Sequence, residues 1–340
     1  MITGLLAVWS VDTPMLRVLE PLRSRALVIG RELFPRDERV HERHFEITRS
    51  HDRLVLTDLG SSHGTYVECI RARQSLDLDD LDTTFNDRRV RAPRSLEPDD
   101  IVRIGNTLLV AVADVTPYRG RTHTRKYGLD VCGSLHAPCE QLAKAILDET
   151  SVAIAGPRWV THLLGSAYLD ARGGGPQIDI AARTHTLEAA LAANSSHTVL
   201  LESPNALLPP EYRTLRNWLE TDVRFITCMR RGRDLDMIPP EIRRWLAPVV
   251  IEIPKPRYDE LPFVIHSVCR YTAEHISIQT SLIEQFLRQV HDDTEDDLFL
   301  RLGETLRIAK RDGVQSIAGL GRVRPERTTF RMTSYPAADD

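Results

Sequence analysis

Four histidines gather in the polar stretch from residue 40 to 67, and they are the first residues in the chain that could carry chemistry. They are His41, His44, His51 and His63. Imidazole can ligate a metal, act as a general base or donate a hydrogen bond to an anion. A zinc site needs three or four converging ligands, and no cysteine except Cys69 belongs to this region, so a metal is disfavoured. We predict no metal ligand and no catalytic residue, and favour an anion.

A phosphate monoester carries about −1.5 to −2 charges and three strong acceptor oxygens, so a site for such an anion needs fixed donors. Arg31, expected at the end of a strand, offers a guanidinium with several donors. Ser62 and the backbone around Gly64 offer short donors, because glycine lets a ligand come close. His41 and His63 carry further ring nitrogens. We expect these residues on loops at one end of a rigid framework.

The framework itself is predicted from short apolar runs broken by turn residues, up to about residue 115. The runs read RALVIGRE, RHFEI, RLVLTDLG, GTYV and DIVRIGNTLLVAVADV. In the third run Leu54 and Leu56 fall on one face of a strand, with Val55 and Thr57 on the other. Many short strands with polar turns predict an all-β sandwich or barrel.

Residues 5–115 resemble a forkhead-associated (FHA) domain, a β-sandwich that binds phosphothreonine. The resemblance rests on motifs in the family order: Gly30-Arg31, HERH at 41–44, SSHGT at 61–65, Asn86-Asp87 and DDIVRIG at 99–105. It implies that Arg31 and Ser62 hold the phosphate. It also implies that His63, which replaces the usual asparagine, braces the residues flanking phosphothreonine. By the same resemblance His44 is a buried structural histidine.

The chain departs from the family at the first loop. His41 stands where the family has a phosphate-contacting serine, and Glu42 where it has a structural arginine. His41 could still donate to phosphate, better when protonated. Glu42 could repel an anion or pair with a neighbour such as Arg43. An FHA fold that has lost phosphate binding therefore stands as an alternative.

An acidic insertion, ECIRARQSLDLDDLDTTF at 68–85, separates the His-Gly-Thr turn from the Asn86-Asp87 turn. Such a run is usually a solvated loop. The alternative is a segment phosphorylated at Thr83 or Thr84 and captured by the Arg31 site of a second copy.

The pattern changes after a basic, glycine-bearing linker. Buried strand-length runs then alternate with amphipathic helices, which predicts a parallel sheet with crossover helices, and the chain continues as helices beyond Pro254. We predict domains at 1–116 (β-sandwich), 117–137 (linker), 138–254 (α/β), 255–315 (helical lid) and 316–340 (flexible tail).

Residues 138–312 resemble the ATPase domain of sigma-54-dependent transcription activators, a branch of the AAA+ class. The resemblance is one of layout, carried by SVAIAGPRWVTHLLGSAYLDA, HTVLLESPNALLPPEYRTLRNWLE and DVRFITCMRR. Its chemistry is missing. At the phosphate-loop position Pro157 removes a donor and His162 replaces the lysine, while the metal-binding strand ends in Glu202-Ser203 instead of Asp-Glu. We expect no ATP hydrolysis and no cofactor; nucleotide binding without hydrolysis stands as an alternative.

The composition excludes several classes. The chain has 340 residues, 42% of them hydrophobic, and a formal net charge of −4, which argues against a chain-wide nucleic-acid or membrane surface. The apolar start MITGLLAVWS lacks the parts of a signal peptide and favours a buried strand. An odd set of five scattered cysteines suits a reducing cytoplasm.

These observations predict a non-enzymatic, cytoplasmic signalling adaptor of bacterial type. Its partner would be a phosphothreonine-bearing protein, either a kinase or a kinase substrate, and the ATPase-like region could mediate self-association. No membrane or direct nucleic-acid partner is expected. The alternative is an ATP-dependent sigma-54-type transcription regulator with an atypical nucleotide site.

Overall fold

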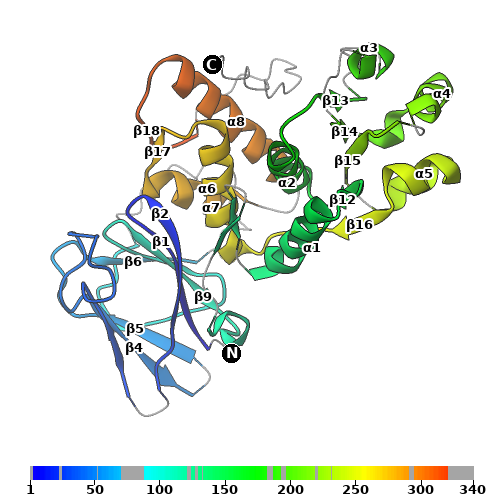
Figure 1. Ribbon diagram of the computed structural model, residues 1–340. Coiled ribbons are helices and arrows are strands. Elements are labelled where there is room, and N and C mark those ends of the chain that lie inside the picture. The colour runs from blue at the N-terminus through cyan, green and yellow to red at the C-terminus, as the bar shows by residue number, and fades with distance from the viewer. Residues whose placement is uncertain are drawn as a thin grey trace. The chain divides into compact units, whose positions relative to one another are not determined.

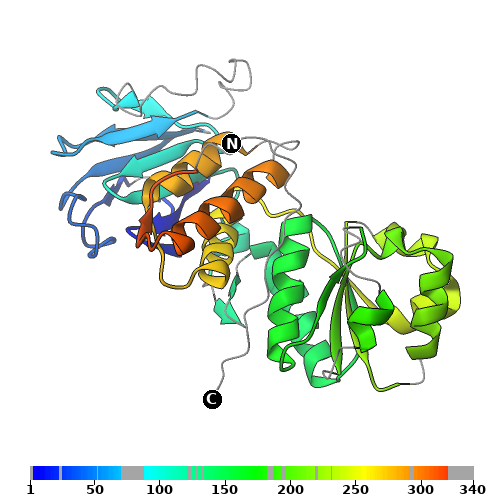
Figure 2. The ribbon, with the colours of Figure 1, turned by 90° about the horizontal axis from the view of Figure 1, so that it is seen from above.

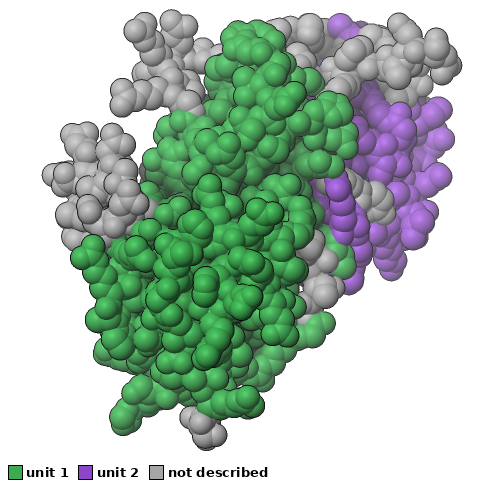
Figure 3. All heavy atoms as spheres, turned by 90° about the vertical axis from the view of Figure 1, so that its left-hand side faces the viewer, with its two compact units in different colours: residues 1–124, 130–133, 256–321 green, residues 125–129, 134–255, 322–340 purple. Residues whose placement is uncertain are grey.

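The computed structural model describes most of the chain. The described residues are 3–22, 25–51, 53–69, 88–120, 124–126, 129–131, 133–181, 187–192, 197–218, 221–230, 232–290 and 295–320. The chain divides into two compact units (Figure 3). Unit 1 comprises residues 1–124, 130–133 and 256–321, and unit 2 comprises residues 125–129, 134–255 and 322–340. The Thr83 and Thr84 hypothesis falls outside the described residues.

The amino-terminal part of unit 1 is a β-sandwich, as the apolar runs predict (Figures 1 and 2). One antiparallel sheet has the order β2-β1-β9-β8-β6, formed by Thr13–Leu19, Gly4–Ser10, Thr107–Val112, Ile101–Ile104 and Thr65–Glu68. The second sheet has the order β3-β4-β5-β7, formed by Leu27–Ile29, Phe45–Ser50, Arg53–Asp58 and Arg94–Ser95. Leu54 and Leu56 point into the shared core, on the face that the alternation predicts.

The first sheet is buried on both of its faces. Leu109 of β9 belongs to the core cluster between the sheets, whereas its neighbour Leu108 does not, yet both side chains are fully buried. In β1 the fully buried Leu5 and Leu6 divide between the two faces in the same way. Strands that are buried on both faces are continuous apolar runs, which explains the sequences GLLAVWS and TLLVAV.

Helices of the carboxyl-terminal part of unit 1 cover the outer face of this sheet. They are α6 (Leu261–Thr272), α7 (Thr280–Gln289) and α8 (Glu295–Arg311), with the short strands β17 (Ser277–Ile278) and β18 (Ser316–Ile317) between and after them. Helix α6 contacts β1 and β2, and α7 contacts β9. The segment expected as a lid of the α/β region is thus grouped with the sandwich, while the individual domain boundaries remain predictions.

Unit 2 is an α/β domain, which confirms the predicted fold class. Its parallel sheet has the order β13-β14-β15-β12-β16, formed by Gln177–Asp179, Thr198–Glu202, Arg224–Met229, Val152–Ala155 and Val249–Glu252. The helices are α1 (His136–Leu147), α2 (Arg158–Ala171), α3 (Leu187–Ala192), α4 (Pro209–Trp218) and α5 (Pro240–Leu246). Ala153 of β12 pairs with Thr227 on one side and Val250 on the other, so β12 is a central strand. Short strands β10 (Thr124–Lys126) and β11 (Leu129–Val131) precede this domain.

Neither a membrane-spanning helix nor a metal-ligand cluster is found among the described residues. None of the helices found there has the length and apolar character needed to cross a bilayer. Within the same residues, no group of three or more His, Cys, Asp or Glu side chains is arranged to hold a metal ion.

The burial of both sheet faces can be tested with adjacent residues. We expect Leu108→Ala and Leu109→Ala each to lower the free energy of unfolding by about 2–4 kcal/mol, because each removes a fully buried side chain and leaves a cavity. Urea unfolding of the full chain measures both. A sandwich with a solvated outer face would instead leave Leu108→Ala within about 0.5 kcal/mol of the wild type.

Candidate functional site

Gly30 fixes the position of Arg31 against the loop at residues 41–44. A Cβ atom on Gly30 would lie 1.8 Å from the carbonyl oxygen of Glu42, so only glycine allows the two backbones to approach this closely. The Arg31 amide then donates to the carbonyl of His41 at 3.0 Å. The end of β3 and the 41–44 loop are therefore held side by side.

The Arg31 side chain is exposed and partly anchored. Its Nε donates to the carbonyl of Val40 at 3.0 Å, and one terminal nitrogen donates to the carbonyl of Glu38 at 3.1 Å. These bonds use only part of the five N–H donors of a guanidinium. Across the described residues no carboxylate lies within ion-pair distance of Arg31, so Glu42 does not neutralise it. The guanidinium is oriented and keeps donors for a ligand.

His44 joins the 41–44 loop to the turn at residues 61–64. It is fully buried; its Nδ1 accepts from the His41 amide at 2.9 Å, and its Nε2 donates to the Gly64 carbonyl at 3.1 Å. Burial lowers the pKa of His44, which favours the neutral ring that this pattern requires. The reading of His44 as a buried structural histidine is confirmed.

Asp58 organises the turn that presents Ser62 and His63. Its carboxylate accepts hydrogen bonds from the Gly60 amide, the Ser61 amide, the Ser61 hydroxyl and the Thr65 hydroxyl, at 2.6 to 2.9 Å. Burial acts to raise the pKa of Asp58, but the hydrogen bonds from Thr65 and Ser61 outweigh it and hold the pKa below its usual value. Ser62 and His63 are left exposed at the apex, and Gly64 follows in the left-handed region at φ +77°.

Arg89, which was not among the residues predicted from the sequence, places a second guanidinium at this turn. One of its terminal nitrogens donates to the Ser61 carbonyl at 3.1 Å, and a Cβ on Gly64 would lie 2.6 Å from its Nε. The neighbouring Val90 amide donates to the Thr65 carbonyl at 2.8 Å, which attaches this segment to β6. Its position just after the Asn86-Asp87 motif was the available signal.

His41 is exposed beside Arg31, with its Nδ1 3.4 Å from the Arg43 carbonyl. Glu42 and Arg43 are exposed as well. The ion pair between Glu42 and Arg43 that the sequence allowed is not found in the described part of the loop. The altered loop thus contributes one imidazole near the predicted site, together with a carboxylate that has no ion pair among the described residues.

A cleft of about 440 Å³ adjoins the 58–64 turn on the side of Arg89. Asp58, Gly60, Arg89, Arg91 and Pro93 are among its lining residues. The hydrogen-bond donors around Asp58 already occupy both of its carboxylate oxygens, so the two arginines set the character of the cleft. The arrangement brings Arg31, His41, Ser62, His63 and Gly64 onto connected loops.

Residues 60–64 also match the Gly-x-Ser-x-Gly pattern of serine hydrolases, centred on Ser62. In those enzymes the serine stands on a sharp turn from a strand to a helix. Here the turn joins β5 to β6, and Ser62 has no hydrogen bond to a histidine in the described structure. The turn therefore differs from the strand-to-helix setting in which that pattern supplies a nucleophile.

In unit 2, His162 of α2 and Glu202 of β14 form an ion-pair contact. His162 Nδ1 lies 2.6 Å from Glu202 Oε1. By the resemblance to an ATPase domain, these two residues stand where the phosphate-loop lysine and the metal-binding carboxylate are expected. Burial acts to raise the pKa of Glu202, but His162 and Arg158 outweigh it and lower the pKa, so the carboxylate is held ionised. Trp159 and Val160 are buried in the first turn of α2.

Comparisons with known proteins place part of the chain in a family. Residues 26–105 match the model of the FHA domain. A search of curated proteins finds no match to the chain.

Several solved structures are similar to parts of the chain. The FHA domain of the CT664 protein from Chlamydia trachomatis is 18% identical over 32% of this chain and 96% of that chain, with a TM-score of 0.24. The FhaA FHA domain, solved in complex with the intracellular domain of Rv3910, is 24% identical over 32% of this chain and 98% of that chain, with a TM-score of 0.23. NtrX from Brucella abortus, solved with ATP, is 14% identical over 55% of each chain, with a TM-score of 0.37, so this chain spans about half the length of NtrX.

The family match covers β3 to the end of β8, and it includes every loop that His44 and Asp58 hold in place. Residues 26–105 of this chain are an FHA domain.

Proposed function

We propose that this chain is a non-catalytic signalling adaptor that binds phosphothreonine through the Arg31 loop and the Ser61–Gly64 turn. The observation that carries the proposal is the anchored Arg31 guanidinium, which has no ion pair among the described residues and lies on a loop that His44 ties to the turn beside Arg89. The partner is a kinase or a kinase substrate that carries the modified threonine.

The chemistry of the loops supports a dianion as the ligand. Hydrogen bonds from a guanidinium to a phosphate are charge-assisted and about twice as strong as neutral ones. Ser62 and His63 add exposed donors at the apex of the turn, and His41 adds another beside Arg31. Because hydrogen bonds already fix the backbone of each loop, little ordering remains to be done when the ligand binds.

We further propose that unit 2 serves as a platform for protein interaction or assembly and does not hydrolyse ATP. The His162–Glu202 pair supports this, because the histidine lacks the reach and the permanent charge of a phosphate-loop lysine. A nucleotide would have to break this pair, and the strand position that should carry the water-activating glutamate is Ser203. No observation favours the transcription-regulator alternative.

The phosphothreonine proposal is tested by Arg31→Ala in the full chain. We expect affinity for a fluorescent peptide pool with one fixed phosphothreonine to fall about 10- to 100-fold, because a charge-assisted hydrogen bond contributes about 1.5–3 kcal/mol. Fluorescence polarisation measures the change. Arg36→Ala is the matched control, since Arg36 is an exposed arginine on the same loop paired with Asp12. Binding that ignores the phosphate, or that survives Arg31→Ala, contradicts the proposal.

The lowered pKa of His44 makes stability depend on pH. Between the ordinary histidine pKa of 6.5 and the lower folded value, the unfolded chain holds a proton that the folded protein does not, so acidification through this range lowers the free energy of unfolding. Urea midpoints at about pH 7.5 and about pH 5.5 measure the decline. We expect His44→Gln to make the decline smaller, and the exposed His275→Gln to leave it unchanged. An equal decline in wild type and His44→Gln would refute this role.

The His162–Glu202 pair predicts that Mg-ATP does not stabilise the chain. A ligand that binds only the folded state adds about 2.7 kcal/mol at a hundredfold excess over its dissociation constant. We therefore expect each thermal transition to stay within about 1 °C when millimolar Mg-ATP is added. A shift of several degrees would favour the ATP-dependent alternative.

A further inference from the structure

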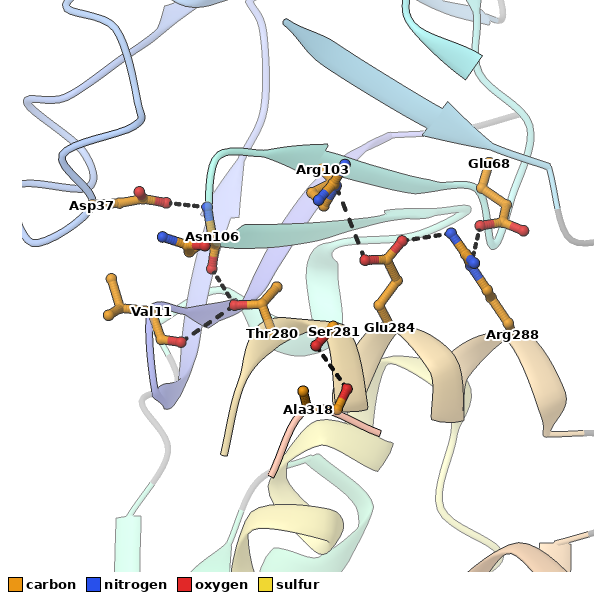
Figure 4. Close-up of polar contacts among 10 residues, drawn as sticks. All are labelled: Val11, Asp37, Glu68, Arg103, Asn106, Thr280, Ser281, Glu284, Arg288 and Ala318. Atoms are coloured by element: carbon orange, nitrogen blue, oxygen red, sulfur yellow. Dashed lines mark hydrogen bonds and ion pairs between the residues drawn. The ribbon is translucent and has the colours of Figure 1, made fainter. Parts of the chain in front are cut away.

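Helix α7 lies on the outer face of the sheet whose strand β6 leads out of the Ser61–Gly64 turn (Figure 4). Val67 of β6 points into the sandwich core, so Tyr66 and Glu68 point to the opposite face. Arg103 of β8 is the register partner of Tyr66 and lies on the same face, with its guanidinium 4.8 Å from the centre of the Tyr66 ring. This part of the face is charged where the rest is apolar.

Glu68 is the centre of a buried ion network between the sheet and α7. Its side chain is fully buried, and its Oε2 lies 2.6 Å from Nε of Arg288. Arg288 also contacts Glu284, one turn earlier in α7, at 2.6 Å, and Glu284 lies 4.0 Å from Arg103. The signs of the charges alternate along the network. Because an unpaired buried carboxylate is costly, this arrangement fixes the position of α7 on the sheet.

The network continues from Glu68 into the binding loops. The other oxygen of Glu68, Oε1, lies 2.5 Å from a terminal nitrogen of Arg88. Arg88 directly precedes Arg89, whose backbone forms a β-bridge to Tyr66 and whose side chain holds the Ser61 carbonyl. A continuous set of contacts therefore runs from Arg288 of α7 to the second guanidinium of the site.

The amino-terminal end of α7 contacts Asn106, which is hydrogen-bonded to the loop that anchors Arg31. Thr280 Oγ1 lies 2.8 Å from the Asn106 carbonyl and 3.2 Å from the Val11 carbonyl (Figure 4). The Asn106 amide donates to the buried Asp37 carboxylate at 2.7 Å, and Asp37 also accepts from the Arg39 amide at 3.2 Å. Asp37 and Arg39 belong to the loop whose carbonyls anchor Arg31. Both ends of one helix thus adjoin the two loops that carry the proposed cations.

We propose that α7 is an internal support of the phosphopeptide site, and that Arg288 is a positioning residue that acts on it through Glu68, Arg88 and Arg89. This inference rests on the proposed phosphothreonine function. It implies that a partner that draws α7 away from the sheet releases the bound phosphopeptide. The FHA domain is then a regulated binding module, with its control element about 200 residues further along the chain in the same compact unit.

The test compares Arg288→Met with Arg311→Met in the full chain. Arg311 is an exposed arginine of α8, so its variant removes the same charge from the same helical layer. With the phosphothreonine peptide pool as the probe, we expect Arg288→Met to weaken binding about 5- to 10-fold and Arg311→Met to leave it within about twofold of wild type. Arg288→Lys, which keeps the charge, should recover part of the loss. Circular dichroism at the assay temperature establishes that each variant is folded.

A double-mutant cycle separates positioning from general destabilisation. If Arg288 acts through Arg89, the Arg288→Met loss should shrink to less than about twofold in an Arg89→Met background. Equal losses in the two backgrounds, or a folded Arg288→Met that binds like wild type, overturn the inference.

Hydrogen exchange separates this inference from the proposed function. In the absence of peptide, Arg288→Met should accelerate exchange at Val90, whose amide bonds to Thr65, whereas Arg311→Met should not. Suppose that Arg288→Met accelerates exchange at Val90, but the wild type binds phosphorylated and unphosphorylated peptide equally. The proposed phosphothreonine function is then wrong, and the coupling between α7 and the loops stands. If the wild type binds in a phosphate-dependent manner and Arg288→Met leaves exchange at Val90 unchanged, only the proposed coupling is wrong.

Discussion

A neutral, fully buried imidazole joins the loops on which the proposed function depends. His44 bonds to the His41 amide on one side and the Gly64 carbonyl on the other, so its single ring sets the separation of the two loops. The Arg31 amide bonds to the His41 carbonyl of the first loop, and the Arg89 side chain lies against Gly64 of the second. A group that has to accept on one side and donate on the other selects one tautomer of histidine, and burial keeps it uncharged.

The helical layer extends this support beyond the sandwich. The FHA match ends at residue 105, yet the sheet that carries β6 is buried on its outer face by helices that follow the α/β domain in sequence. Unit 1 is therefore built from chain segments that lie before and after the α/β domain in the sequence. The apolar outer face stabilises this association, and the Glu68–Arg288 pair sets its register.

The sequence predicted the fold and most of the candidate site, for identifiable reasons. Gly30, His44 and the 61–65 turn could be recognised because a close backbone approach, a buried hydrogen-bonded bridge and a left-handed residue each accept few residue types. Arg89 was not predicted because a lone arginine has no pattern of its own; the Asn86-Asp87 motif before it was the only available signal, and its role comes from a β-bridge to Tyr66. The packing of α6–α8 with the sandwich was not predicted, because these helices follow the α/β domain in the sequence and were expected to pack on it. The signal was the unbroken apolar run of β9, which indicates a strand covered on both faces.

If the Arg31 loop and the turn beside Arg89 bind one phosphothreonine ligand, both guanidinium groups should respond to it in side-chain NMR of the full chain with ¹⁵N-labelled arginine. Titration with the phosphothreonine peptide pool should shift the Nε–H resonances of both arginines in a saturable manner, and the unphosphorylated pool should leave them unmoved. Resonances of Arg31 and Arg89 that stay in place, or that respond equally to both pools, would contradict phosphothreonine binding at these loops.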